Sequence, residues 1–221
     1  MSTPSKEAPQ TKSTSTSVPG PRSADDPAII AAMPEQTAEM MPVAAGGGMT
    51  RAATAMLAML RIGLGLVFAW AFLDKVFGLG YSTPAARAWI NGGSPTRGFL
   101  GSIDQGPFAS MFRSMAGTVW ADWLFMLSLA GLGFALLLGI GMRVAAVAGT
   151  ILMAMMWMAE WPPAKTTNAG QPTGSTNPLI DYHVIYALAM ISLALLYAGN
   201  RWGLGRRWSQ MSIVQRNRWL I

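Results

Sequence analysis

The chain has 221 residues, of which 52% are hydrophobic and only 12% are charged, and its formal net charge is +6. This composition is typical of membrane proteins rather than soluble ones. The chain has no cysteine and a single histidine, which excludes disulfides, cysteine-ligated iron–sulfur or zinc sites and bis-histidine haem. No protein-ligated metal is expected. The basic residues flank apolar runs, so no nucleic-acid partner is expected either.

The first 50 residues differ in composition from the rest. Ser, Thr, Pro, Gly and Ala dominate residues 1–50, and acids outnumber bases there. Such a segment buries too little apolar surface to offset its ordering entropy, so it is predicted to be a disordered cytoplasmic tail. It is not a signal peptide, because no apolar stretch follows a basic start; the first long apolar run begins at Ala52.

Four apolar runs are long enough to cross the hydrocarbon core, which needs about 20 residues in a helix. The sequence therefore predicts an all-α, membrane-spanning four-helix bundle. A tight hairpin is expected between the second and third spans, where only residues 141–143 separate them. The spans are about 54–78, 119–140, 143–161 and 181–199.

Short helices are predicted in the long loop between the first and second spans. Thr83-Pro84 and Ser94-Pro95 place a capping residue before a proline, and Pro107 precedes another short apolar-faced segment. Asn177-Pro178 gives the same signal before the fourth span. The loop helices are expected to lie at the outer membrane interface.

The basic residues predict the orientation of the domain at 51–208 and of the basic C-terminal tail at 209–221. Arg51, Arg143 and the arginines after residue 200 flank one side of the spans, which is expected to be cytoplasmic. Both termini are then cytoplasmic, in a bacterial cell membrane. All five acids after residue 50 fall on the opposite side, in or beside the outer loops.

Two cations interrupt the first span. Arg61, Gly65, Phe68, Phe72 and Lys75 share one helix face, with the two cations about 21 Å apart. Intramembrane charges usually face the bundle interior or a wet cavity. The alternative is that Arg61 snorkels to the inner head groups and Lys75 to the outer ones.

Several ionisable residues are predicted to lie at one depth, near the outer ends of the spans. Closure of the bundle would arrange them around one outer site. The alternative is a set of interfacial helix caps, in which the helix dipole favours an acid in the first turn of the fourth span. The residues are Asp74, Lys75, Asp122, Glu160, Asp181 and His183.

A histidine beside carboxylates can exchange protons at physiological pH, and aromatic walls at the interface suit a quinone head group. Quinone reduction takes up two protons with two electrons, so it needs groups of this kind. The candidate catalytic residues are His183, Asp181, Glu160, Asp122 and Lys75.

Four segments of the sequence resemble a known family. They are RIGLGLVFAWAFLDK, GFLGSIDQGPFASMFRSMAG, ADWLFMLSLAGLGFALLLGIGMRVAAVAGT and NPLIDYHVIYALAM, within residues 51–208. They resemble the DoxX/DoxD family of bacterial four-helix membrane proteins, and the loop and the DYH start look more like the DoxD branch. Many members have glycine three residues before the lysine, where this chain has Phe72.

The resemblance implies a membrane subunit of a thiosulfate:quinone oxidoreductase, which oxidises thiosulfate to tetrathionate outside and passes electrons to membrane quinone. The expected partners are the lipid bilayer, quinone and a second oxidoreductase subunit. A non-catalytic scaffold that docks a peripheral oxidoreductase remains an alternative, as does a small transporter. Outer cations would attract the thiosulfate dianion. Candidate substrate-binding residues are Arg61, Arg87, Arg97, Arg113 and Lys165.

Overall fold

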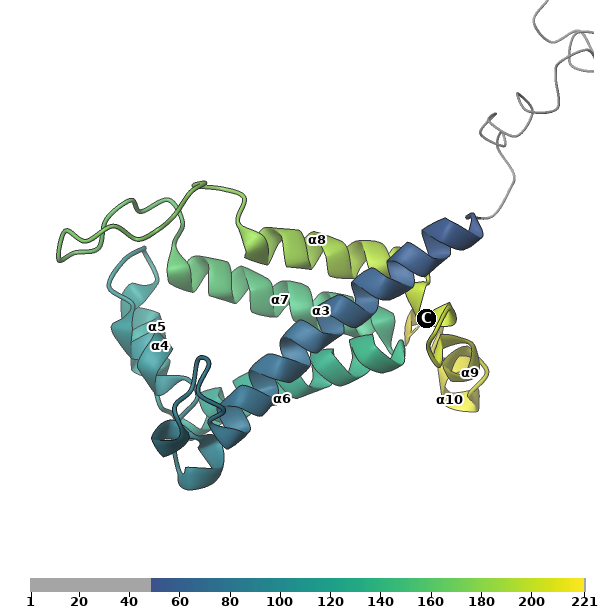
Figure 1. The fold of residues 1–221 in the computed structure, drawn as a ribbon, viewed down its shortest axis with the longest axis horizontal. Coiled ribbons are helices and arrows are strands. Elements are labelled where there is room, and N and C mark those ends of the chain that lie inside the picture. Colours follow the sequence, from purple (N-terminus) through teal and green to yellow (C-terminus); the bar gives the residue numbers. More distant parts are fainter. Residues whose placement is uncertain (1–48, 221) are drawn as a thin grey trace, which may run out of the picture. The chain divides into compact units, whose positions relative to one another are not determined.

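The computed structural model describes residues 49–220, so the predicted disordered tail lies outside the described residues. The described part is helical and contains no β-strand, only an isolated bridge between Thr166 and Pro172. Four helices form its body (Figure 1): α3 (Arg51–Phe77), α6 (Val119–Leu138), α7 (Met142–Glu160) and α8 (Tyr182–Leu195).

The four helices pack as two pairs, α3 with α6 and α7 with α8, joined through the contact between α6 and α7. Glycine brings the first pair together: a Cβ at Gly133 would lie 2.8 Å from the backbone nitrogen of Ala69. Gly149 of α7 leaves room for the Met190 side chain of α8, which an added Cβ would meet. The pairs share one apolar core, which includes Phe68, Met126 and Leu193 among its buried members.

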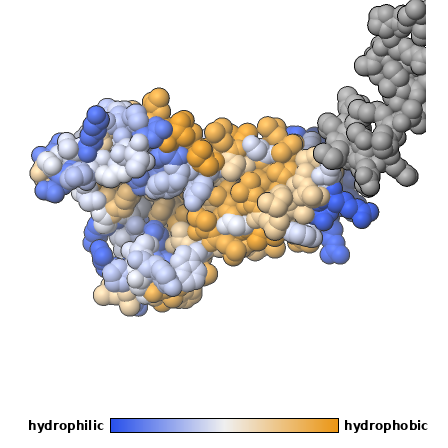
Figure 2. Space-filling model, turned by 45° about the horizontal axis from the view of Figure 1, so that its top comes forward, coloured by the Kyte–Doolittle hydropathy of each residue, from blue (hydrophilic) through white to orange (hydrophobic). Residues whose placement is uncertain are grey.

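Three of these helices, α3, α6 and α7, are long and apolar enough to cross a bilayer. Many large apolar side chains on them face outward, such as Leu66, Leu127 and Val147, with exposed fractions of 56%, 61% and 63%. Figure 2 shows a hydrophobic belt on one face of the molecule, between two hydrophilic ends. The surface therefore fits contact with lipid tails in the middle and with water at both ends.

The fourth predicted span differs from the structure. Helix α8 has 14 residues, starting at Tyr182 and ending at Leu195. At 1.5 Å per residue it is about 21 Å long, shorter than a hydrocarbon core of about 30 Å. The chain turns at Tyr197, whose φ of 51° is left-handed, and a short 3₁₀ helix, η3 (Ala198–Asn200), follows. The expected fourth span over 181–199 is therefore not one continuous helix.

The start of α8 also differs from the prediction. The Asn177-Pro178 pair forms a turn, in which the Asn177 side chain accepts hydrogen bonds from the amides of Leu179 and Ile180. Asp181 is the N-cap instead, and its carboxylate accepts from the amides of His183 and Val184.

The loop between α3 and α6 does contain short helices. They are η1 (Ala85–Arg87), η2 (Trp89–Asn91), α4 (Arg97–Ser102) and α5 (Ala109–Met115). Leu100 and Phe112 of α4 and α5 pack against Ala159 of α7 in a second apolar cluster. The loop thus starts on α3 and reaches across to the end of α7.

The opposite end holds the hairpin and the C-terminal segment. Gly139 and Gly141, both with positive φ, make the tight connection from α6 to α7, as predicted. The basic tail is not extended: α9 (Gly205–Ser209), α10 (Ser212–Arg216) and η4 (Arg218–Leu220) fold at this end (Figure 1).

Not every glycine near the α6–α7 connection is used in close packing. Gly131 and Gly141 have no atom within 4 Å of an added Cβ, so neither is required by close packing. The close approach of α6 to α3 uses Gly133, two residues after Gly131 on the same helix.

Candidate functional site

A cleft of about 1020 Å³ lies at the end of the molecule that carries the long loop between α3 and α6. Figure 1 shows the α3–α6 pair diverging from the α7–α8 pair toward this end. The cleft is lined by residues of both pairs and by the loop, with α4 and α5 at its side. Its deep walls are apolar, with Phe125 from α6 and Ile151, Leu152 and Met155 from α7.

Cations line the cleft on the side of α3 and the loop. Lys75 comes from the last turn of α3, and Arg87 and Arg97 come from η1 and α4. Lys75 Nζ lies 3.4 Å from the Ser82 hydroxyl and 5.8 Å from the centre of the Phe125 ring. Both arginines are exposed. This side of the cleft is therefore positive and open to solvent.

The acidic side of the cleft comes from α7 and α8. Glu160, at the last residue of α7, and Tyr182, at the first of α8, both line it. The Tyr182 hydroxyl donates a hydrogen bond of 2.9 Å to Glu160 Oε1. About 35% of the Glu160 side chain remains exposed. Glu160 can therefore contact both the cleft and the residues behind it.

His183 lies behind Glu160 and is 1% exposed. Its Nδ1 is 2.8 Å from Asp181 Oδ2, and its Nε2 is 4.0 Å from Glu160 Oε1. The Asp181 carboxylate also caps α8, which fixes its position. A carboxylate at Nδ1 holds the imidazole in the tautomer that leaves the Nε2 lone pair free. Asp181 and His183 thus form a close pair, and the Nε2 of His183 faces Glu160, which lines the cleft.

The predicted ring of six residues does not form a single cluster. The acid and histidine groups that come together in the described residues are Glu160, Asp181 and His183. Asp74 instead accepts hydrogen bonds from the backbone of Tyr81 and Ser82 and from the Ser82 hydroxyl. These hydrogen bonds use the Asp74 carboxylate to hold the start of the loop between α3 and α6.

Asp122 has the same kind of role on α6. One of its oxygens accepts hydrogen bonds from the Ser94 hydroxyl at 2.8 Å, the Thr96 amide at 3.0 Å and the Thr96 hydroxyl at 2.6 Å. It is 8% exposed and does not line the cleft. The structure thus places Asp122, a candidate catalytic residue, in a loop-anchoring position.

Three of the candidate substrate-binding residues also lie away from the cleft lining. Arg61 is fully buried and donates to the carbonyls of Leu136, Leu137, Arg201 and Trp202, so it neither snorkels nor faces substrate. Arg113 and Lys165 do not line the cleft. The Arg113 guanidinium donates to the Ile103 carbonyl at 2.6 Å.

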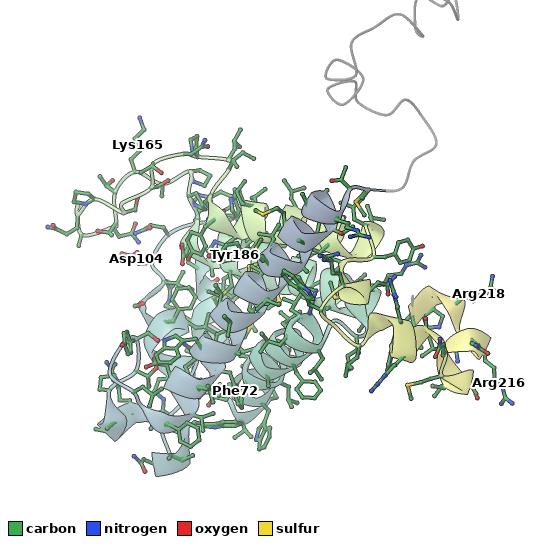
Figure 3. The ribbon with its side chains drawn as sticks, turned by 45° about the vertical axis from the view of Figure 1, so that its right-hand side comes forward. Phe72, Asp104, Lys165, Tyr186, Arg216 and Arg218 are labelled. Atoms are coloured by element: carbon green, nitrogen blue, oxygen red, sulfur yellow. The ribbon has the colours of Figure 1, made fainter. Side chains whose placement is uncertain are left out.

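Lys165 lies on the exposed loop after α7. Figure 3 shows it at the end of the molecule that also carries Asp104, with its side chain directed away from the helices. The same view places Arg216 and Arg218 at the opposite end. Lys165 contributes charge to this end of the molecule rather than a side chain to the cleft.

Sequence reasoning missed two residues of the site. In the sequence, Tyr182 is only part of the DYH motif at the start of the fourth span. In the structure, its hydroxyl donates a hydrogen bond to Glu160 and so links α8 to α7. Phe125 was part of an apolar run, although its ring faces Lys75. The i to i+3 spacing of Asp122 and Phe125 on one helix is a signal that could have placed the ring near the same end.

Loss of the Asp122 carboxylate should free the loop at Ser94 and Thr96. In Asp122→Ala, we expect trypsin to cleave the purified protein after Arg97 at least about tenfold faster, because hydrogen bonds to a charged group are worth about 1.5–3 kcal/mol each. Asp104→Ala is the control, since Asp104 holds Asn168 of a different loop. Equal cleavage after Arg97 in all three proteins would contradict the anchoring role.

No family model, no curated protein and no solved structure matches this chain. The functional argument therefore depends on the residues and on their geometry.

Proposed function

We propose that the chain is a DoxD-like membrane subunit of a thiosulfate:quinone oxidoreductase in the bacterial cell membrane, with quinone bound in the cleft. The observation that carries the proposal is the combination of groups that line this cleft. Lys75, Arg87 and Arg97 supply positive charge, Glu160 and Tyr182 supply proton-exchanging groups, and Phe125, Ile151 and Met155 supply apolar surface. The cations suit a thiosulfate dianion, and the apolar surface suits a quinone ring.

The reaction requires both features. Two thiosulfate ions each lose one electron and join through a new sulfur–sulfur bond to give tetrathionate. One quinone takes up these two electrons and two protons to become quinol. The positive side lowers the energy of bringing two dianions together. Glu160, backed by His183 and Asp181, supplies protons to the quinone oxygens.

The openness of the cleft fits these substrates. Quinone is dissolved in the bilayer and thiosulfate in water, so the site has to admit one from each phase. Phe125, Ile151 and Met155 form an apolar wall, whereas Arg87 and Arg97 are exposed. The cleft volume of about 1020 Å³ is large enough for a ring and an anion together.

The orientation follows from the charges at the two ends. Arg143 donates to the Arg218 carbonyl at 3.3 Å, so the hairpin and the basic C-terminal segment lie together. We place this end, with both chain termini, in the cytoplasm, and the cleft at the outer side. In this arrangement α8 and the turn that follows it complete a four-helix membrane bundle.

The proposal is tested by labelling with a photoactivatable azidoquinone. We expect labelled peptides from α6 and α7, and competition by unlabelled quinone. Ala148 lines the cleft, so Ala148→Trp should fill it and lower labelling at least about tenfold. Val147→Trp is the matched control, because Val147 does not line the cleft and is 63% exposed on the same helix.

Labelling that unlabelled quinone does not compete, or that is equal in the two tryptophan variants, would contradict quinone binding in the cleft. That result would favour the alternative of a scaffold that docks a peripheral oxidoreductase subunit.

A further inference from the structure

The cluster of Glu160, Asp181 and His183 has a feature that proton exchange does not require. One potential ligand atom from each residue lies within 4.8 Å of the other two. His183 is 1% exposed, and its Nε2 makes no hydrogen bond within residues 49–220. The Nε2 atom faces the Glu160 carboxylate at 4.0 Å, and no hydrogen bond joins the two, so its lone pair is available to a ligand.

We propose that this cluster binds a divalent first-row transition ion of the Zn²⁺ type, through His183 Nε2 and the Glu160 carboxylate. The two atoms are 4.0 Å apart, too far for a hydrogen bond. Two ligands at about 2.1 Å from a tetrahedral ion lie about 3.4 Å apart, so closure by about 0.6 Å is needed. The Glu160 side chain, 35% exposed at the edge of the cleft, has room to make this movement.

Asp181 holds the imidazole for this role. Histidines that bind metals commonly donate their other ring N–H to a carboxylate, and Asp181 Oδ2 lies 2.8 Å from His183 Nδ1. Asp181 itself is fixed as the N-cap of α8. The ring orientation is therefore set before the ion arrives, and water in the cleft completes the coordination.

The ligand types select the ion. Imidazole nitrogen with carboxylate oxygen suits Zn²⁺, Co²⁺ or Cu²⁺, whereas Mg²⁺ prefers oxygen ligands alone and keeps its waters. The sequence predicts no protein-ligated metal, because the spacing of residues 160, 181 and 183 matches no known pattern of metal ligands. They meet only because α7 and α8 pack side by side.

Metal binding by this chain cannot involve a cysteine or a second histidine, because it has no cysteine and His183 is its only histidine. The full-length protein, with a tag that contains no histidine, is titrated with Co²⁺ and then with Zn²⁺. We expect one Co²⁺ per chain with visible d–d absorption, displaced by Zn²⁺ and unaffected by excess Mg²⁺. The readout is binding, so it does not depend on the proposed redox function. The ion would occupy the Nε2 lone pair and the Glu160 carboxylate that the proposed proton exchange uses, so bound Zn²⁺ would inhibit that exchange and take no part in it.

The variants identify the ligands. We expect Glu160→Gln and His183→Gln each to weaken Zn²⁺ binding at least about tenfold, and Asp181→Asn to weaken it by about 10- to 100-fold through the imidazole. Asp104→Asn, an acid outside the cluster, should bind as wild type does. If His183→Gln does not fold, the partly exposed Glu160→Gln alone decides. Absence of stoichiometric binding, or equal binding in Glu160→Gln and wild type, would overturn the proposal.

Discussion

Replacing His183 by glutamine should lower thiosulfate-dependent quinone reduction, per folded chain, by about 10² to 10⁴, the usual contribution of a positioned acid or base. Glutamine keeps polarity and similar reach, so the helices should still pack. It cannot carry the proton that the Nε2 of His183 would exchange with Glu160, 4.0 Å away. Turnover is measured in membranes and normalised to the amount of folded protein.

Asp181→Asn should act in the same direction, because asparagine can still cap α8 but does not fix the imidazole tautomer. The double variant should lose less than the sum of the single effects, since the two residues act as one unit. Asp104→Asn is the matched control. Activity near that of the wild type in both single variants would contradict a catalytic role for the pair. Asp181 would then act only as the N-cap of α8.

Replacing Arg61 by methionine should strongly destabilise the bundle. The Arg61 guanidinium donates to the carbonyls of Leu136 and Leu137 at the end of α6, and to those of Arg201 and Trp202 in the C-terminal turn. Methionine fills a similar volume but leaves buried carbonyls without a donor, at a cost of about 1–3 kcal/mol each. We expect a loss of about 3 kcal/mol or more.

The measurement is the thermal unfolding midpoint in detergent. Arg51→Met is the matched control, because Arg51 is an exposed arginine at the start of the same helix. Arg61→Lys should be intermediate, since an ammonium cannot reach both pairs of carbonyls with the fork that arginine offers. An Arg61→Met midpoint equal to that of Arg51→Met would show that the buried hydrogen bonds add nothing.

The positions and lengths of the apolar runs predicted the long helices well, because these features depend on neighbouring residues in the sequence. The apolar runs mark α3, α6 and α7 to within a few residues, and residues 141–143 gave the hairpin. The end of α8 could not be predicted, because Tyr197 takes a left-handed conformation without glycine or proline to signal it. The turn that follows is fixed by a tertiary contact: Gly199 lies against the Gly139 backbone, where a Cβ would clash.

The sequence predicted which ionisable residues lie near this end of the helices, but not which of them contact one another. The sequence placed the acids at one end of the spans, and Glu160, Asp181 and His183 do meet there. It could not show that the carboxylates of Asp74 and Asp122 accept hydrogen bonds from hydroxyls and amides of the loop between α3 and α6. The partners of Asp122, Ser94 and Thr96, lie 26 to 28 residues earlier in the chain.

The most direct test of the account is turnover by the purified chain alone, in lipid nanodiscs, with thiosulfate and a quinone analogue. The account predicts quinol and tetrathionate in equal amounts, with two thiosulfate ions consumed for each, and loss of this activity in Ala148→Trp but not in Val147→Trp. Folded wild-type protein that binds no quinone and forms no tetrathionate would contradict it, and would leave the chain as a scaffold for another oxidoreductase.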